Sequence, residues 1–102
     1  MELSIKERIL LLNTLPAEGD ITTIRIVRQL REALSFSEQE HDDHGIKQED
    51  GQIHWNESGY SKDIEFGPKA SKLAAKVLKK LSDGDKLTLD YIGLYDKFVV
   101  ED

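Results

Sequence analysis

The dipeptide Asp50-Gly51 lies between two short segments of alternating polarity, and it restricts the fold more than any other feature of the sequence. The favoured two-residue β-turn needs positive φ angles at both central residues, which aspartate and glycine tolerate. The alternation runs from Ile46 before the turn to Trp55 after it, in a register that places these two residues opposite each other. The sequence therefore predicts a β-hairpin in the middle of the chain.

Two helices are predicted near the start of the chain. Ser4 and Glu7 have the spacing of a capping box, which predicts a first helix from Ile5 onward. Asp20 is a further cap residue, and apolar residues spaced three or four apart predict a second helix over residues 21–34. The β-branched residues at the beginning of that segment leave a strand as the alternative there.

A second capping box, Ser37 with Glu40, predicts a short third helix just before the hairpin. Gly45 supplies the left-handed residue that commonly ends a helix. This helix is very acidic, which matters for its function more than for its fold.

The segments after the hairpin predict one strand and two helices. Residues 62–66 alternate in polarity and predict a third strand, which follows a mobile loop at residues 57–61. Gly67-Pro68 marks the start of a fourth helix, because proline is tolerated at the first helical position. Thr88 is the expected cap of a last helix, and the fourth helix carries an apolar stripe of Leu73, Val77, Leu78 and Leu81.

These elements predict one α+β domain over residues 1–102 that is mostly helical. It has about five helices and a small antiparallel hairpin sheet. With 102 residues, 38% of them hydrophobic, the chain can bury one modest core but not two. The expected core is Ile9, Leu12, Leu30, Trp55, Phe66, Val77 and Phe98.

Composition excludes several kinds of site. The chain contains no cysteine, so disulfides and thiolate metal sites are excluded. Its apolar runs are too short to span a bilayer, and its first residues lack the features of a secretion signal. The sequence therefore predicts a soluble cytoplasmic protein that does not contact membranes.

The net charge of −6 is concentrated in the middle of the chain. Residues 35–67 carry two basic and nine acidic side chains, whereas the basic and acidic residues nearly balance before and after this segment. Such a field attracts basic partners and repels phosphates. The candidate interaction residues are Glu38, Glu40, Asp42, Asp43, Glu49, Asp50 and Trp55.

His41 and His44 are weak candidates for a metal site, because histidines three apart lie on one helix face. An exposed acidic surface is the favoured interpretation of this segment, and a pH-sensitive interface is a further alternative. No hydroxyl lies in a motif that exposes a nucleophile, and no glycine-rich loop could hold phosphate. We therefore expect neither an enzyme nor a cofactor.

The order of three helices and a hairpin resembles a winged-helix arrangement over about half of the chain. In such a fold the third helix enters the major groove and needs basic or amide side chains. Here that helix is acidic, so binding of nucleic acid is the alternative and not the leading hypothesis.

Two further features could contact a partner. The lysines of the fourth helix form a basic stripe, interpreted as a solvated face. The alternatives are docking onto the acidic middle of a second copy and contact with RNA or an anionic surface. Trp55 is expected to pack in the core against Ile46 and the fourth helix, or to serve as an interface anchor if it is partly exposed.

Several parts of the chain share one resemblance: residues 36–48, Gly51, Trp55, residues 64–67 and the ending over residues 87–99. They resemble small uncharacterised proteins encoded by bacteriophages and prophages. The shared residues are packing, capping and turn residues, so the resemblance suggests a source but no activity. Because such proteins are often interaction modules, it favours partner binding by analogy.

The leading hypothesis is a non-enzymatic protein-interaction module that uses its acidic surface. Reversing the charges of Glu40, Asp42 and Asp43 is expected to abolish partner capture while thermal stability stays nearly unchanged.

Overall fold

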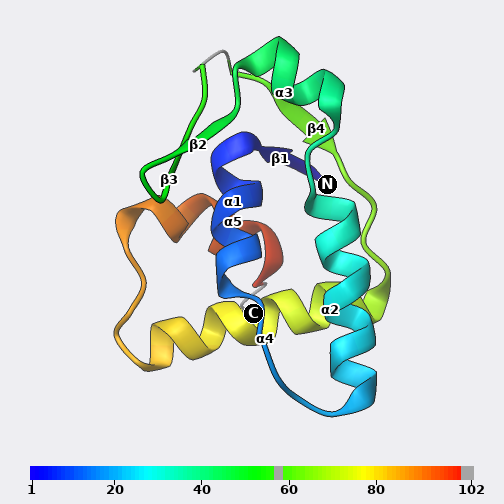
Figure 1. The fold of residues 1–102 in the computed structure, drawn as a ribbon. Helices are drawn as coiled ribbons and strands as arrows, with labels where there is room; N and C mark the ends of the chain where they lie inside the picture. Colours follow the sequence, from blue (N-terminus) through cyan, green and yellow to red (C-terminus); the bar gives the residue numbers. More distant parts are fainter. Residues whose placement is uncertain (57–58, 100–102) are drawn as a thin grey trace.

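The computed structural model describes residues 1–56 and 59–99, and it shows an α+β fold that is mostly helical, as predicted (Figure 1). In chain order the elements are β1 (Glu2–Ser4), α1 (Ile5–Thr14), α2 (Ile21–Leu34), α3 (Glu38–His44), β2 (Lys47–Glu49), β3 (Gln52–His54), β4 (Ser61–Asp63), α4 (Pro68–Asp83), a 3-10 turn (Leu89–Tyr91) and α5 (Ile92–Phe98). No helix within the described residues is both long enough and apolar enough to cross a bilayer.

The predicted helix starts are confirmed by their hydrogen bonds. The Ser4 hydroxyl accepts from the Glu7 amide at 3.1 Å, and the Glu7 carboxylate accepts from the Ser4 amide at 3.0 Å. The same reciprocal pair joins Ser37 and Glu40 at the start of α3. The Asp20 carboxylate accepts a hydrogen bond from the Thr23 amide, and this bond lowers the pKa of Asp20. Local sequence therefore determines where α1, α2 and α3 begin.

The ends of the later helices are partly as expected. Gly45 follows α3 in the left-handed conformation, with φ of 58°, and Pro68 begins α4. Thr88 makes no side-chain capping bond, and the residues after it form a 3-10 turn before α5 begins at Ile92. The last helix is therefore shorter than predicted.

The hairpin forms at the predicted turn. Asp50 and Gly51 have φ angles of 52° and 75°, as this turn requires. Lys47 lies opposite His54, which is the predicted register. All six residues of β2 and β3 are exposed, so the hairpin contributes little to the core.

The prediction for the third strand is only partly right. It forms over Ser61–Asp63, earlier than predicted, and pairs antiparallel with β1 instead of extending the hairpin. Residues 57 and 58 of the expected loop lie outside the described residues. The strand β1 was not predicted, because its three residues lead directly into the capping box of α1. The β1–β4 pair positions Leu3 and Ile64 in the core, where both are buried.

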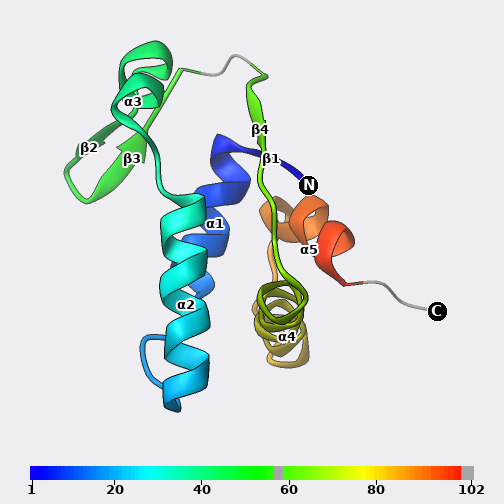
Figure 2. The same ribbon diagram turned by 90° about the vertical axis from the view of Figure 1, so that its right-hand side faces the viewer.

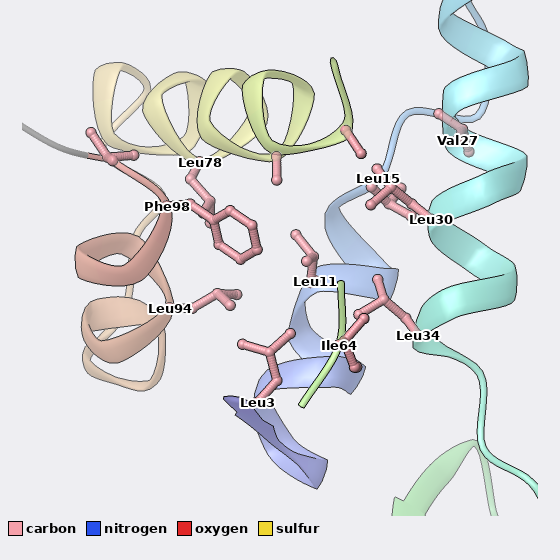
Figure 3. Packing of buried hydrophobic residues seen from close by; sticks show 13 residues of the cluster. Leu3, Leu11, Leu15, Val27, Leu30, Leu34, Ile64, Leu78, Leu94 and Phe98 are labelled. Carbon is pink, nitrogen blue, oxygen red and sulfur yellow. The ribbon is translucent and has the colours of Figure 1, made fainter. Parts of the chain in front are cut away.

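The core lies between α1, α2, α4 and α5 (Figure 3). Its buried members are Leu3, Leu11, Leu15, Val27, Leu30, Leu34, Ile64, Ala70, Ala74, Leu78, Leu94, Phe98 and Val99. Leu30 and Phe98 were predicted correctly, and Leu12 and Phe66 pack against the cluster while partly buried. Ile9, Val77 and Trp55 are not members of the cluster, so their assignment to the core was wrong.

The molecule has two parts that differ in how they are held. The body consists of β1, α1, α2, β4, α4 and α5, and it contains the apolar core. The remaining part, α3 with the β2–β3 hairpin, projects from one end of α1 and α2, away from α4 (Figure 2). We call this part, residues 38–54, the acidic end. The two small sheets are separate, so β1 does not join the hairpin.

Candidate functional site: the acidic end

The acidic end presents five exposed carboxylates on two adjacent elements. Three lie on α3 and two at the hairpin turn: Glu38, Asp42, Asp43, Glu49 and Asp50. Within this set, Asp43 accepts a side-chain hydrogen bond from the amide of Gln39 at 2.8 Å. These residues therefore meet solvent as the sequence predicted.

Glu40 does not belong to this exposed surface, and its assignment as an interaction residue was wrong. It is only 7% exposed, and its carboxylate lies 2.5 Å from Nη1 of Arg8 in α1. As the third residue of a capping box, Glu40 turns its side chain back toward the start of α3, where α1 lies. Reversing its charge would therefore damage the fold as well as any surface.

Arg8 and Glu40 form the centre of a buried polar network. Arg8 is fully buried and donates to the backbone carbonyls of Leu34 and Ser35 at 3.2 and 2.6 Å. The Tyr60 hydroxyl donates to Glu40 at 2.9 Å. Among the described residues, no buried side-chain nitrogen or oxygen lacks a hydrogen-bond partner. The network thus joins α1, the end of α2, α3 and the segment after the hairpin.

The network shifts two pKa values in opposite directions. Burial by itself would raise the pKa of Glu40, but hydrogen bonds from Arg8, the Ser37 amide and Tyr60 lower it to about 2. The hydrogen bond to Glu40, together with burial, raises the pKa of Tyr60 above its usual value of 10.0. Near neutral pH the network therefore holds a charged carboxylate and a neutral phenol.

Both histidines of α3 take part in contacts that hold the acidic end together. Nδ1 of His41 lies 3.1 Å from the carbonyl oxygen of Ile46, across the end of the helix. The ring of His44 stacks on Tyr60 with centroids 4.0 Å apart. Within residues 1–56 and 59–99, no three His, Asp or Glu side chains are arranged to hold a metal ion.

Trp55 lies beside the start of α1 and not against α4. It is partly buried and lines a hollow of about 180 Å³ together with Lys6, Tyr60, Ser4, Ile5, Asn56 and Gly59. The core position expected for Trp55 was wrong, because the hairpin projects away from the body. Its alternative role as a partly exposed anchor fits this position.

Sequence reasoning missed Arg8 and Tyr60. Arg8 occupies the inward stripe of α1 between Ile5 and Leu11, where an apolar residue would be expected. The available signal was a charge in that position together with a capping-box glutamate at the start of another helix. Tyr60 carries no local signature, because its role depends on the path of the chain after the hairpin.

This arrangement is suited to recognition of a cationic surface. Exposed carboxylates lie on a helix and a hairpin, and the buried network joins the helix and the segment after the hairpin to the body. The partly buried Trp55 and the exposed Ile53 add apolar contact area next to the charges. The chain matches no protein-family model, no curated protein and no solved structure.

Proposed function

We propose that this protein is a non-enzymatic protein-interaction module that binds a basic partner protein through its acidic end. The proposal rests on a contrast in exposure among the carboxylates of that end. Its carboxylates are exposed, whereas the one carboxylate that stabilises its attachment, Glu40, is buried. The exposed carboxylates thus lie outside the buried network that attaches α3 to the body.

The proposed contact surface combines charge with apolar anchors. Protein interfaces commonly place aromatic side chains at the centre and charged side chains at the rim. Trp55 and Ile53 supply the apolar part, and the exposed set supplies the charge: Glu38, Asp42, Asp43, Glu49 and Asp50. Electrostatic attraction would mainly increase the association rate and select for basic partners.

Charge argues against the winged-helix-like alternative, in which α3 would bind nucleic acid. The exposed side chains of α3 include Glu38, Asp42 and Asp43, which repel phosphates. We also propose, from the sequence alone, that the protein comes from a bacteriophage or prophage and acts in the cytoplasm.

The test is a charge reversal that spares Glu40. The triple variant Asp42→Lys, Asp43→Lys, Glu49→Lys changes only exposed residues, and lysines near the end of α3 are favourable to the helix dipole. The matched control Glu32→Lys, Glu65→Lys, Asp96→Lys makes the same change in net charge on the exposed surface of the body. Both variants should keep the melting temperature of the wild type.

The three proteins are used to capture partners from a nuclease-treated lysate of the native cell, and each captured protein is then purified and titrated. We expect one protein to bind the wild type and the control, and to bind the acidic-end variant at least about tenfold more weakly. Equal affinities for all three would contradict the proposed surface. Retention of nucleic acid from an untreated lysate by all three would favour the winged-helix-like alternative.

A further inference from the structure

A groove runs along the body between α4 and the loop that joins α1 to α2. Its volume is about 580 Å³, which is within the range of binding pockets. Its apolar lining from α4 is Leu73, Val77 and Leu81. Three lysines and one glutamate add charge to the lining: Lys76, Lys80, Lys86 and Glu18.

The groove exists because α4 has more apolar surface than the core covers. The buried face of α4 consists of Ala70, Ala74 and Leu78. Leu73, Val77 and Leu81 form a neighbouring row that remains only partly buried. Helices usually bury such a row against another element.

An exposed apolar surface follows the end of α4. Leu89 is 86% exposed and Ile92 is 54% exposed, and neither belongs to the core cluster. Leu89 begins the 3-10 turn and Ile92, three residues later, begins α5, so the two side chains lie on one face. The flanking residues include the exposed acidic side chains of Asp83, Asp85 and Asp90. We call Leu89 and Ile92 the apolar pair.

The groove and the apolar pair are complementary in two respects. The groove has partly buried aliphatic side chains and an excess of positive charge, whereas the apolar pair has exposed aliphatic side chains flanked by aspartates. They also lie near each other along the chain, because Gly84 and Lys86 line the groove and Leu89 follows three residues later. Figure 1 shows the chain turning back from the end of α4 into the segment that leads to α5.

We propose that the groove of one copy receives the apolar pair of a second copy, so that two identical contacts related by a two-fold axis form a homodimer. A two-fold arrangement uses the same two surfaces on both copies and closes the assembly at two chains. This inference concerns a different surface from the acidic end and does not rest on the proposed function. The dimer leaves the acidic end free to bind its partner.

The first experiment measures the weight-average mass by sedimentation equilibrium over about a hundredfold range of protein concentration. The wild type should change from monomer to dimer over this range and reach a plateau at two chains. Leu89→Ser with Ile92→Ser should weaken dimerisation at least tenfold without changing the melting temperature, because both side chains are exposed. Ile21→Ser is the control, since Ile21 is 65% exposed but does not line the groove.

A second pair of variants tests the groove itself. Lys76→Glu with Lys80→Glu reverses two exposed charges of the groove and should weaken dimerisation to a similar extent. Lys69→Glu with Lys79→Glu makes the same change of charge on exposed residues of α4 that do not line the groove. The control should dimerise more strongly than the groove variant.

Because the native chain has no cysteine, single introduced cysteines report the contact directly. An equimolar mixture of Leu89→Cys and Lys80→Cys proteins should form a mixed disulfide dimer on mild oxidation, whereas a mixture of Ile21→Cys and Lys80→Cys proteins should not. A monomer at every concentration, growth beyond two chains, or dimerisation unaffected by the Leu89 and Ile92 substitutions would overturn the proposal. A groove that binds an acidic amphipathic peptide while the protein stays monomeric would also overturn it.

Discussion

The body and the acidic end are held by different kinds of interaction. Thirteen buried apolar residues form the core cluster of the body, whereas Ile46 is the only buried apolar residue within the acidic end. The acidic end depends instead on the network of Arg8, Glu40 and Tyr60. Apolar burial tolerates small rearrangements, but a buried ion pair requires both partners and their geometry. The position of the acidic end is therefore specified by a few polar atoms.

This difference predicts that the two parts respond differently to the same loss of stability. A buried ion pair adds little net stability compared with an apolar replacement, but removing one partner is costly. The network should therefore act mainly to orient α3 and the hairpin on the body. Three predictions test this contrast.

The largest effect is expected for Arg8→Ala, which should lower the free energy of unfolding by about 3–5 kcal/mol. Glu40 would then remain buried without its charge partner, and two backbone carbonyls would lose their donor. Urea denaturation measures the loss of stability. Hydrogen exchange should show that amides of residues 38–54 become less protected to a greater extent than those of α2.

The control for this variant is Leu78→Ala, which removes a fully buried side chain of the body and should cost about 2–5 kcal/mol. In this variant, amides of the body should lose at least as much protection from hydrogen exchange as amides of the acidic end. If the two variants gave the same pattern of hydrogen exchange, the proposed difference between the two parts would be wrong.

An intermediate effect is expected from pH. The pKa of Glu40 in the folded protein is about 2, below its ordinary value of 4.5. A lowered carboxylate pKa contributes stability that is complete above the ordinary pKa and is lost as the pH falls toward the folded value. Stability should therefore decrease between about pH 4.5 and pH 2, as measured by urea denaturation at each pH.

Glu40→Gln separates this contribution from that of the other carboxylates. The variant should be less stable than the wild type at pH 7, and the difference should shrink as the pH falls through this window. A difference that stays constant down to pH 2 would show that the charge of Glu40 does not stabilise the fold.

The smallest effect is expected for the helix caps. Ser37→Ala should cost about 1 kcal/mol, because an amide at the start of α3 loses its acceptor. Ser4→Ala removes the equivalent cap of α1 and should cost a similar amount. Ser37→Ala should increase hydrogen exchange mainly within residues 38–54, whereas Ser4→Ala should not. Equal changes in both parts of the molecule would contradict the contrast.

Features with a local cause were predicted from the sequence, and those with a distant cause were not. The capping boxes at Ser4 and Ser37 and the turn at Asp50 depend on residues within a few positions, so their sequence patterns identify them. The β1–β4 pair joins Glu2 to Asp63 across most of the chain, and no short pattern records that pairing.

The candidate site shows the same limit. The exposure of Asp42, Asp43 and Glu49 was predicted because runs of charge usually face solvent. Glu40 lies within the same run but is buried, because Arg8 reaches it from 32 positions away. A single charged residue on the inward stripe of α1 thus decides which of the neighbouring carboxylates is structural.

The carboxylate of Glu40 accepts hydrogen bonds both from Ser37, just before α3, and from Tyr60, after the hairpin. The chain between Ser37 and Tyr60 therefore leaves and rejoins the rest of the molecule at the Glu40 carboxylate, so it forms a closed loop. Lengthening a closed loop costs little free energy, since the cost grows only slowly with its length. The hairpin turn lies away from the Glu40 contacts, so it should accept exchange or extension while those contacts and the body stay unchanged.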